Sequence, residues 1–185
     1  MLEALITSKT RMKLLLKFFL NSNASSYLRN LSDEFGESTN SIRVELNRLE
    51  KAGLLQVQSS GNKKLFRANI RHPLFPDIQN IMMKHTGLDK VIAEIIENLG
   101  DIRKVYVTGD FAGGIDSKII DLILVGEIDR VYLIKLTAKV EEHINRKIRY
   151  AVFGEDEFGE YKLQKNADEL FLIWEKNNEK QDEMM

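Results

Sequence analysis

Two groups of side chains in this sequence have types and spacings that could do chemistry. The first is a small, polar and basic face of one predicted helix, formed by Thr39, Asn40, Arg43, Val44 and Asn47. Asn and Arg pair with base edges in the major groove, so this face could read a DNA duplex. The second is a glycine-rich segment, 109–114, followed by the carboxylate of Asp121 within an apolar run. Such glycines let backbone N–H groups approach phosphates, and strand carboxylates can hold Mg²⁺.

A helix that starts after Ser38 must position the first group. Serine is a good N-cap, because its hydroxyl accepts a hydrogen bond from an early backbone N–H group. The buried stripe of this helix recurs at i, i+4 and i+7, with Ile42, Leu46 and Leu49. Two further helices are predicted before it: a first over residues 8–20, and a short second one that buries Tyr27 and ends at Gly36. The helix after Ser38 is the third; it ends at Gly53, and Glu45 lies at the edge of its exposed face.

A basic β-hairpin is predicted next. Residues 54–59 and 63–68 read as strands, joined by a turn at Ser60-Gly61-Asn62. Lys63, Lys64 and Arg67 give the hairpin positive charge. Basic side chains that lie over phosphates release counterions, so the hairpin could strengthen binding to any duplex. Two helices across a tight turn, followed by a basic hairpin, predict a winged helix-turn-helix domain.

Charge is divided between the two halves of the chain. Residues 1–76 hold 12 Lys and Arg against 6 Asp and Glu, whereas residues 77–185 hold 15 against 22. The net charge of −1 therefore hides a basic half and an acidic half, which suggests a nucleic-acid-binding part joined to another part. The two prolines, Pro73 and Pro76, fall at the same point. We therefore predict two domains, 1–76 and 77–185.

Composition excludes several classes of protein. The share of hydrophobic residues, 43%, and of charged residues, 30%, is ordinary for a folded chain and excludes a disordered one. The absence of cysteine excludes disulfides, thiolate zinc sites and thiol catalysis. His72, His85 and His143 show no metal-ligand spacing, so no metal site is predicted. Without a membrane-length apolar stretch or a signal-peptide pattern, we expect a cytoplasmic protein with no membrane partner.

The first half resembles the ArsR-like winged-helix regulators. Leu28 to Gly36 and Ser38 to Leu55 carry the likeness, which covers roughly residues 10–72. It implies a sequence-specific transcriptional regulator that binds double-stranded DNA as a homodimer. The residues predicted to contact DNA are Ser38, Thr39, Asn40, Arg43, Asn47, Lys63, Lys64 and Arg67. Metal-sensing members of that family use cysteines, so the metal-sensor role does not carry over to this chain.

The second half alternates helices with strands, which predicts a small α/β sheet domain and makes the whole chain α+β. The predicted helices span residues 88–99 and 129–144, and the predicted strands span 105–107, 119–125, 147–153 and 170–174. A further helix, from Phe75 to Lys84, would link the two domains. Its Ile78, Ile81 and Met82 are candidates for a dimer contact or for packing within the chain.

Gly109 to Gly114 and Lys118 to Gly126 look like the nucleotidyltransferase motif, in a likeness that covers about residues 88–155. That family places a Gly-Ser turn between two strands and then two carboxylates two residues apart, which hold the magnesium ions of the nucleotide. Aligned on Asp121, the first carboxylate falls on Ile119.

Other parts of the motif are also missing. The turn serine falls on Asp110, the usual arginine of the turn falls on Gly113, and residues 147–153 hold no third acid. One carboxylate cannot hold two metal ions, so we predict a degenerate, non-catalytic domain that serves for ligand sensing or assembly. The protein is then not an enzyme and needs no cofactor.

Two alternative functions stay open at this point. One is a Mg-dependent nucleotidyltransferase with a non-standard acid set, and the other is an antitoxin-like protein-interaction module. Weak binding of Mg²⁺ or a nucleotide also stays open, and Asp121 could instead be a structural, hydrogen-bonded carboxylate. The candidate nucleotide-binding residues are Gly109, Asp110, Gly113, Gly114 and Asp121.

Overall fold

A computed structural model describes residues 2–164 and 169–176, and the chain divides into two compact units. The first unit comprises residues 1–89 together with 110–117, and the second comprises 90–109 and 118–185. The first unit thus extends past residue 76 and takes in a segment from the middle of the second half. Every helix in the described part of the chain is too short or too polar to cross a lipid bilayer.

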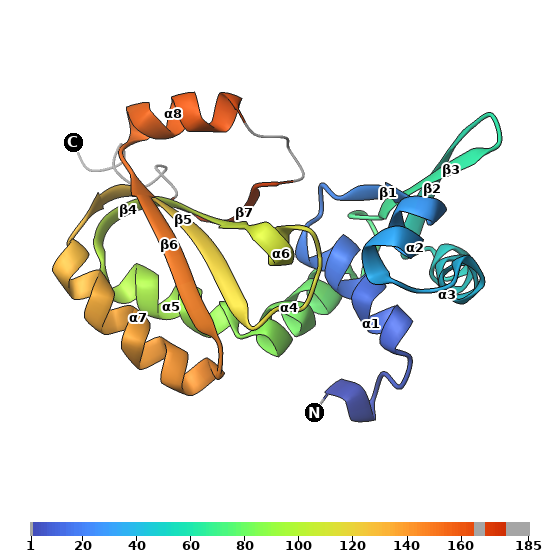
Figure 1. Ribbon diagram of the computed structural model, residues 1–185, viewed down its shortest axis with the longest axis horizontal. Coiled ribbons are helices and arrows are strands. Elements are labelled where there is room, and N and C mark those ends of the chain that lie inside the picture. The colour runs from blue at the N-terminus through green and yellow to red at the C-terminus, as the bar shows by residue number, and fades with distance from the viewer. Residues whose placement is uncertain (1, 165–168, 177–185) are drawn as a thin grey trace. The chain divides into compact units, whose positions relative to one another are not determined.

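The first unit combines helices with a three-stranded antiparallel sheet of order β1-β3-β2 (Figure 1). Its elements are a 3₁₀ turn (Leu2–Ala4), α1 (Lys9–Leu15), the π-helical η2 (Leu16–Leu20), β1 (Ser25–Tyr27), α2 (Leu28–Phe35), α3 (Thr39–Lys51), β2 (Leu55–Ser60), β3 (Lys63–Ala68) and α4 (Phe75–Thr86). The predicted hairpin and the predicted helix after Ser38 are therefore present.

The beginning of the chain differs from the prediction in two ways. Residues 8–20 were expected to form one helix, but the α-helix gives way to π-helical turns after Leu15. Tyr27, expected on the buried face of the second helix, is the last residue of β1 and pairs with Leu65. A strand of three residues is too short to show a period of two, so its pattern could not be recognised.

Local sequence accounts for the position of α3. Gly36 adopts a left-handed φ of 62° where α2 ends, and the Ser38 hydroxyl accepts a hydrogen bond from the Ser41 N–H at 3.1 Å. The stripe predicted to be buried is buried, with Ile42 at 0%, Leu46 at 1% and Leu49 at 6% exposure. These features hold the opposite, polar face of α3 towards solvent.

Glu45, expected at the edge of the exposed face, is instead buried at 6% exposure. Arg11 of α1 donates to it from Nε at 2.9 Å, and Arg48 donates from Nη1 at 3.1 Å. Burial raises the pKa of Glu45, but the hydrogen bonds and charges around it, those of Arg11 foremost, outweigh burial and lower that pKa below its ordinary value. The ion pair with Arg11 therefore ties α3 to α1.

A segment from far along the chain completes the first unit. It contains most of α6 (Gly109–Ala112) and the residues up to 117, and its Phe111 and Ala112 are buried. The buried Asn21 side chain donates a hydrogen bond to the Ala112 carbonyl at 3.2 Å. A β-carbon on Gly114, whose φ is +80°, would lie 2.1 Å from the Cα of Lys17. Only glycine allows this close backbone approach.

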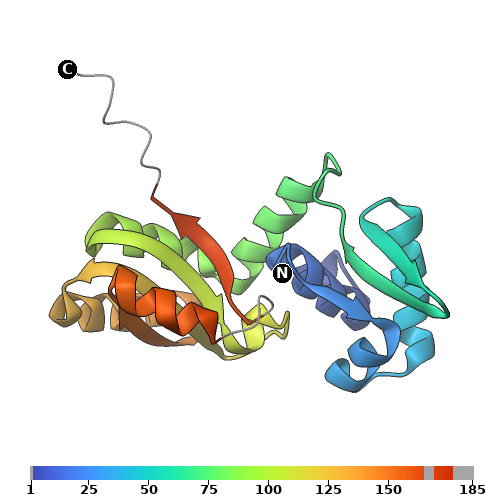
Figure 2. The same ribbon diagram turned by 90° about the horizontal axis from the view of Figure 1, so that it is seen from above.

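The second unit is a four-stranded sheet of order β6-β5-β4-β7 with helices on both faces (Figure 1). Strands β5 and β6 are parallel and the other neighbours are antiparallel; β7, drawn in red, runs along the edge beside β4 (Figure 2). Its elements are α5 (Leu88–Asn98), β4 (Gly100–Thr108), β5 (Ile119–Ile128), α7 (Arg130–Ile144), β6 (Lys147–Phe153), α8 (Glu155–Leu163) and β7 (Phe171–Glu175). The α+β prediction is confirmed.

The core of this unit has two layers, one on each face of the sheet. Helices α5 and α7 cover one face and α8 covers the other (Figure 1). Phe158 of α8 packs against Tyr106 of β4 with ring centroids 4.8 Å apart. Leu133, Leu136 and Val140 form the buried side of α7. Val131 and Ile134, two other apolar residues of the predicted helix, are 68% and 61% exposed.

Replacement of Gly114 by alanine should destabilise the first unit. The new β-carbon would overlap the backbone of Lys17, and overpacking adds to the strain of a left-handed φ, so we expect a loss of about 3 kcal/mol in the free energy of unfolding. Gly36→Ala is the matched control, because Gly36 also has a positive φ but no atom within 4 Å of its ideal Cβ. That variant should lose only about 1 kcal/mol. Equal losses in denaturant titrations would show that the close approach is unimportant.

Glu45 should make stability depend on pH. Because its folded pKa lies below the ordinary value of 4.5, its stabilising effect is present above that pH and is lost as the pH falls through the folded pKa. Glu45→Gln should therefore lower the free energy of unfolding by about 1 to 2 kcal/mol at neutral pH, and the difference from the unaltered protein should shrink in acid. Glu50→Gln, at a more exposed pair with Lys64, should change it by less than about 0.5 kcal/mol. A pH-independent difference for Glu45→Gln contradicts this account.

Candidate nucleic-acid interface

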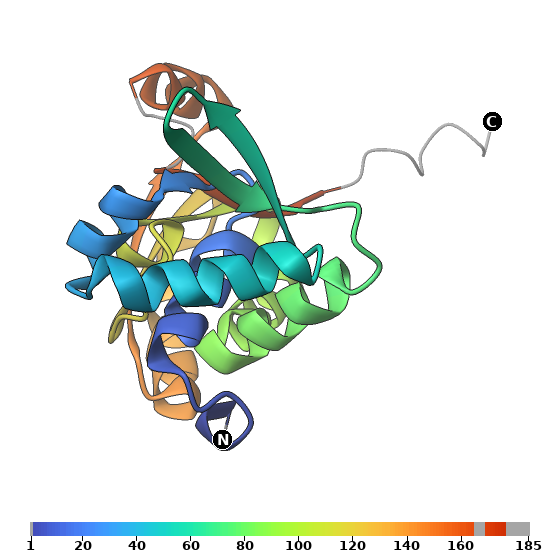
Figure 3. The same ribbon diagram turned by 90° about the vertical axis from the view of Figure 1, so that its right-hand side faces the viewer.

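A groove of about 700 Å³ runs between α2, α3 and the β2–β3 hairpin of the first unit. In Figure 3, α3 is the cyan helix and the hairpin is drawn in green. Buried Leu46 and Phe66 lie among the residues that line the groove and give it an apolar base. The complete lining consists of Tyr27, Leu28, Arg29, Asn30, Arg43, Leu46, Asn47, Asn62, Lys63, Lys64 and Phe66.

The charges along this groove are all positive. Four of the lining residues are cations and three are asparagines, namely Arg29, Arg43, Lys63, Lys64, Asn30, Asn47 and Asn62. No carboxylate is among the described residues that line it. A cationic surface that also offers amide donors and acceptors is suited to an anionic polymer whose units carry hydrogen-bonding edges.

The structure brings together half of the residues predicted to contact DNA. Arg43 and Asn47 of α3 and Lys63 and Lys64 of the hairpin all line the groove. Arg67 does not, because it alternates along β3 with the buried Phe66 and Ala68 and so lies on the outer face. The remaining three, at or beside the start of α3, are exposed but lie outside the groove: Ser38, Thr39 and Asn40.

Four groove residues were missed by sequence reasoning: Tyr27, Arg29, Asn30 and Asn62. Tyr27 was assigned to a buried helix face, whereas its ring in fact lies beneath Lys63, with Nζ 6.0 Å from the ring centroid. Arg29 and Asn30 are exposed between the apolar residues Leu28 and Leu31 of α2. Their polarity, at helix positions outside the core, could have marked them as candidates for a binding surface. Their place beside the hairpin could not be predicted, because it depends on the pairing of the short strand β1 with β3.

One acidic residue comes close to the groove cations. Glu50 at the end of α3 lies 3.6 Å from Lys64, and the two side chains are 35% and 54% exposed. An exposed pair of this kind is worth little, so Lys64 can exchange this partner for a phosphate at small cost.

The second group of sequence candidates centres on Asp121 in β5. Arg149, its direct neighbour in β6, donates from Nε to one carboxylate oxygen at 2.6 Å and from Nη2 to the other at 2.8 Å. The Asp121 side chain is only 16% exposed. A cation thus binds both oxygens that a metal would need. This geometry agrees with Asp121 as a structural carboxylate.

The residues present do not fit the two-magnesium site implied by the nucleotidyltransferase likeness. Ile119, which shares the face of Asp121, offers no ligand atom, and Arg149 stands in the strand where a third acid would belong. Across residues 2–164 and 169–176, no three His, Asp or Glu side chains come together as a metal site.

The glycine-rich segment that precedes Asp121 is divided between the two units. A β-carbon on Gly109 would lie 2.5 Å from Oδ2 of Asp121, so Gly109 stays in the second unit beside the carboxylate. Asp110, Gly113 and Gly114 belong to the first unit, where Gly114 is buried. Part of the segment expected to bind phosphates thus packs within the first unit instead.

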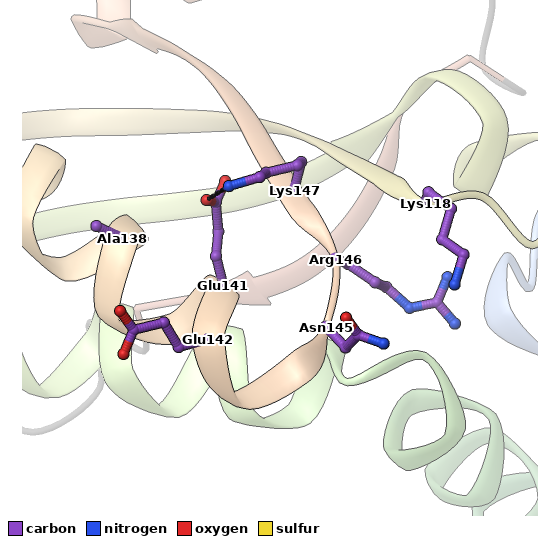
Figure 4. A pocket seen from close by; sticks show the side chains of 7 residues that line it. All are labelled: Lys118, Ala138, Glu141, Glu142, Asn145, Arg146 and Lys147. Atoms are coloured by element: carbon purple, nitrogen blue, oxygen red, sulfur yellow. Dashed lines mark hydrogen bonds and ion pairs between the residues drawn. The ribbon is translucent and has the colours of Figure 1, made fainter.

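A smaller hollow of about 460 Å³ lies in the second unit at the end of α7 (Figure 4). Its main carboxylate, Glu141, accepts hydrogen bonds from Lys147 Nζ at 2.6 Å and from the Ile148 N–H at 2.7 Å. The hydrogen bond from Lys147, followed by that from Ile148, lowers the pKa of Glu141. The carboxylate of Glu141 is therefore already neutralised by Lys147. The lining consists of Lys118, Ala138, Glu141, Glu142, Asn145, Arg146 and Lys147.

No family model matches this chain, and no curated protein matches it. One solved structure with a partial likeness is a mutant of the toxin–antitoxin pair MntA–HpeT, with 14% identity and a TM-score of 0.38 over 49% of this chain and 73% of that one. Another is a candidate nucleotidyltransferase from Sulfolobus solfataricus, with 20% identity and a TM-score of 0.36 over 51% of this chain and 83% of that one. At these scores neither likeness carries an argument about activity. The resemblance to ArsR-like regulators has no support among these matches and stays a prediction.

Proposed function

We propose that the first unit binds double-stranded DNA and that the protein acts as a sequence-specific transcriptional regulator. The observation that carries this proposal is the groove between α3 and the hairpin, which has four cations and no carboxylate among its described lining residues. The order α1, β1, α2, α3, β2, β3, with the sheet order β1-β3-β2, agrees with two helices followed by a hairpin as predicted from the sequence, and it supports the same proposal.

Each part of the groove has a distinct role in this proposal. The exposed face of α3 enters the major groove, where Arg43 pairs with guanine and Asn47 pairs with adenine. Lys63 and Lys64 on the hairpin neutralise phosphates and add affinity that does not depend on sequence. The ion pair between buried Glu45 and the partly exposed Arg11 of α1 holds α3 in place on the side away from the groove residues Arg43 and Asn47.

The second unit has a non-catalytic role in this proposal. Asp121 is held by Arg149, and Ile119 supplies no metal ligand, so nucleotidyl transfer in the family's manner lacks its metal site. A magnesium-dependent nucleotidyltransferase and an antitoxin-like interaction module are the competing functions. No specific contact in the described residues favours either of them over DNA binding.

Substitutions in the groove should separate sequence reading from general affinity. Arg43→Ala and Asn47→Ala should each weaken binding to a preferred duplex, such as one from upstream of the chain's own gene, by about tenfold. They should change binding to an unrelated duplex much less. Lys63→Ala and Lys64→Ala should weaken binding to both duplexes and reduce the salt slope of log K by about 1 each. Fluorescence anisotropy titrations over a range of salt concentrations measure both effects.

Lys51→Ala is the matched control for the charge of the groove. Lys51 is an exposed cation in the last turn of α3 but does not line the groove, so its removal should leave the salt slope nearly unchanged. If all four groove variants bind both duplexes like the unaltered protein, the assignment of the interface is wrong.

Nucleotidyl transfer is tested directly at Asp121. The protein incubated with Mg²⁺, labelled nucleoside triphosphates and candidate acceptors should form no labelled product, because Arg149 holds both carboxylate oxygens. Titration calorimetry with Mg²⁺ should give the same weak or absent heat for the unaltered protein and for Asp121→Asn. Label transfer that Asp121→Ala abolishes would establish the enzymatic alternative.

A further inference from the structure

Tyr27 belongs to three parts of the first unit at once. It is the last residue of β1, it occupies the N-cap position of α2, and it lines the basic groove. Its half-buried ring lies beneath the exposed side chain of Lys63, with Nζ 6.0 Å from the ring centroid. A cation at this distance is attracted by the negative face of a tyrosine ring. Tyr27 therefore acts on one of the two hairpin lysines that the proposed interface uses.

The register of the sheet explains why these two side chains meet. Tyr27 pairs with Leu65 of β3, and Lys63 lies two residues from Leu65 along the same strand. Side chains alternate between the faces of a strand, so Lys63 and Tyr27 are diagonal neighbours on one face, within reach of an aromatic ring and a long side chain. At Lys63, β3 still pairs with β2 but no longer with β1. The ring thus supports a lysine in the part of the hairpin that extends past β1.

The two hairpin lysines have different kinds of partner. Lys64 lies beside Glu50, so a phosphate that binds Lys64 must replace a carboxylate. Lys63 lies over a neutral ring and forms no ion pair with a carboxylate among the described residues. The ring therefore restricts the ammonium group of Lys63 without neutralising its charge. Restriction of a long side chain before binding reduces the entropy that is lost when the side chain is ordered in a complex.

We infer that Tyr27 is a positioning residue of the interface, whose ring holds the ammonium group of Lys63 ready for a DNA phosphate. This inference rests on the proposed function and adds to it a residue that acts through another side chain. An exposed contact between a cation and an aromatic ring changes an equilibrium constant by a factor of about two to five. Loss of the ring leaves the charge of Lys63 in place, so it should lower the affinity without changing the number of phosphates that are neutralised.

A double-mutant cycle tests the inference, with fluorescence anisotropy titrations of the full-length chain on a duplex of random sequence. Tyr27→Leu should weaken binding about two- to fivefold and leave the salt slope of log K unchanged, whereas Lys63→Ala should reduce that slope by about 1. Added to Lys63→Ala, Tyr27→Leu should have no further effect. Added to Lys64→Ala, the matched control, it should keep its full effect. Tyr27→Phe keeps the ring and should bind like the unaltered protein.

A loss that persists in the Lys63→Ala background overturns the inference, because Tyr27 then acts through the fold rather than through this lysine. No loss for Tyr27→Leu, or an equal loss for Tyr27→Phe, overturns it as well. Failure of the unaltered protein to bind any duplex instead contradicts the proposed function.

Nuclear magnetic resonance of the free protein tests the contact without DNA. Protons above an aromatic ring resonate upfield, so the Cε protons of Lys63 should resonate upfield of those of Lys64, and Tyr27→Leu should remove the difference. Equal positions of the two resonances in the unaltered protein overturn the inference, whatever the result with DNA.

Discussion

The close approach of Gly114 to the backbone of Lys17 is the constraint on which the rest of this structure depends. It brings residues 110–117, which lie between β4 and β5 in sequence, into the first unit. The hydrogen bond from buried Asn21 to Ala112 and the burial of Phe111 strengthen the same contact. A glycine-rich segment that could have approached a phosphate is therefore used to complete a protein core.

The chemistry that remains available follows from this use of the segment. In the second unit, Arg149 in the neighbouring strand donates hydrogen bonds to both carboxylate oxygens of Asp121, so this carboxylate is already neutralised. In the first unit, Glu45 is drawn inward by Arg11, which leaves Arg43 and Asn47 on a face free of acids. One arginine–carboxylate pair thus occupies both oxygens of Asp121, and another draws Glu45 away from the exposed face of α3.

The predictions from sequence succeeded where the signal is local. The Ser38 cap, the buried stripe of α3, the hairpin and the strand that contains Asp121 are all set by residues within one element. The failures concern contacts between distant residues. Tyr27 in β1 pairs with Leu65, and Asp121 pairs with Arg149 in β6. Neither pairing leaves a periodic pattern within a single element from which it could be predicted. The need for glycine at position 114 comes from its contact with Lys17, a helical residue almost one hundred positions earlier.

The salt dependence of binding to a DNA duplex of random sequence tests the central claim most directly. Arg29, Lys63 and Lys64 are the three groove cations without a proposed base contact, and their neutralisation of phosphates predicts that log K falls linearly with log salt concentration, with a slope of about −2 to −3. This measurement needs no knowledge of the target sequence and reports on the groove as a whole. A slope in that range agrees with the proposed interface. A duplex that fails to bind at low salt, or binds with a slope near zero, contradicts it.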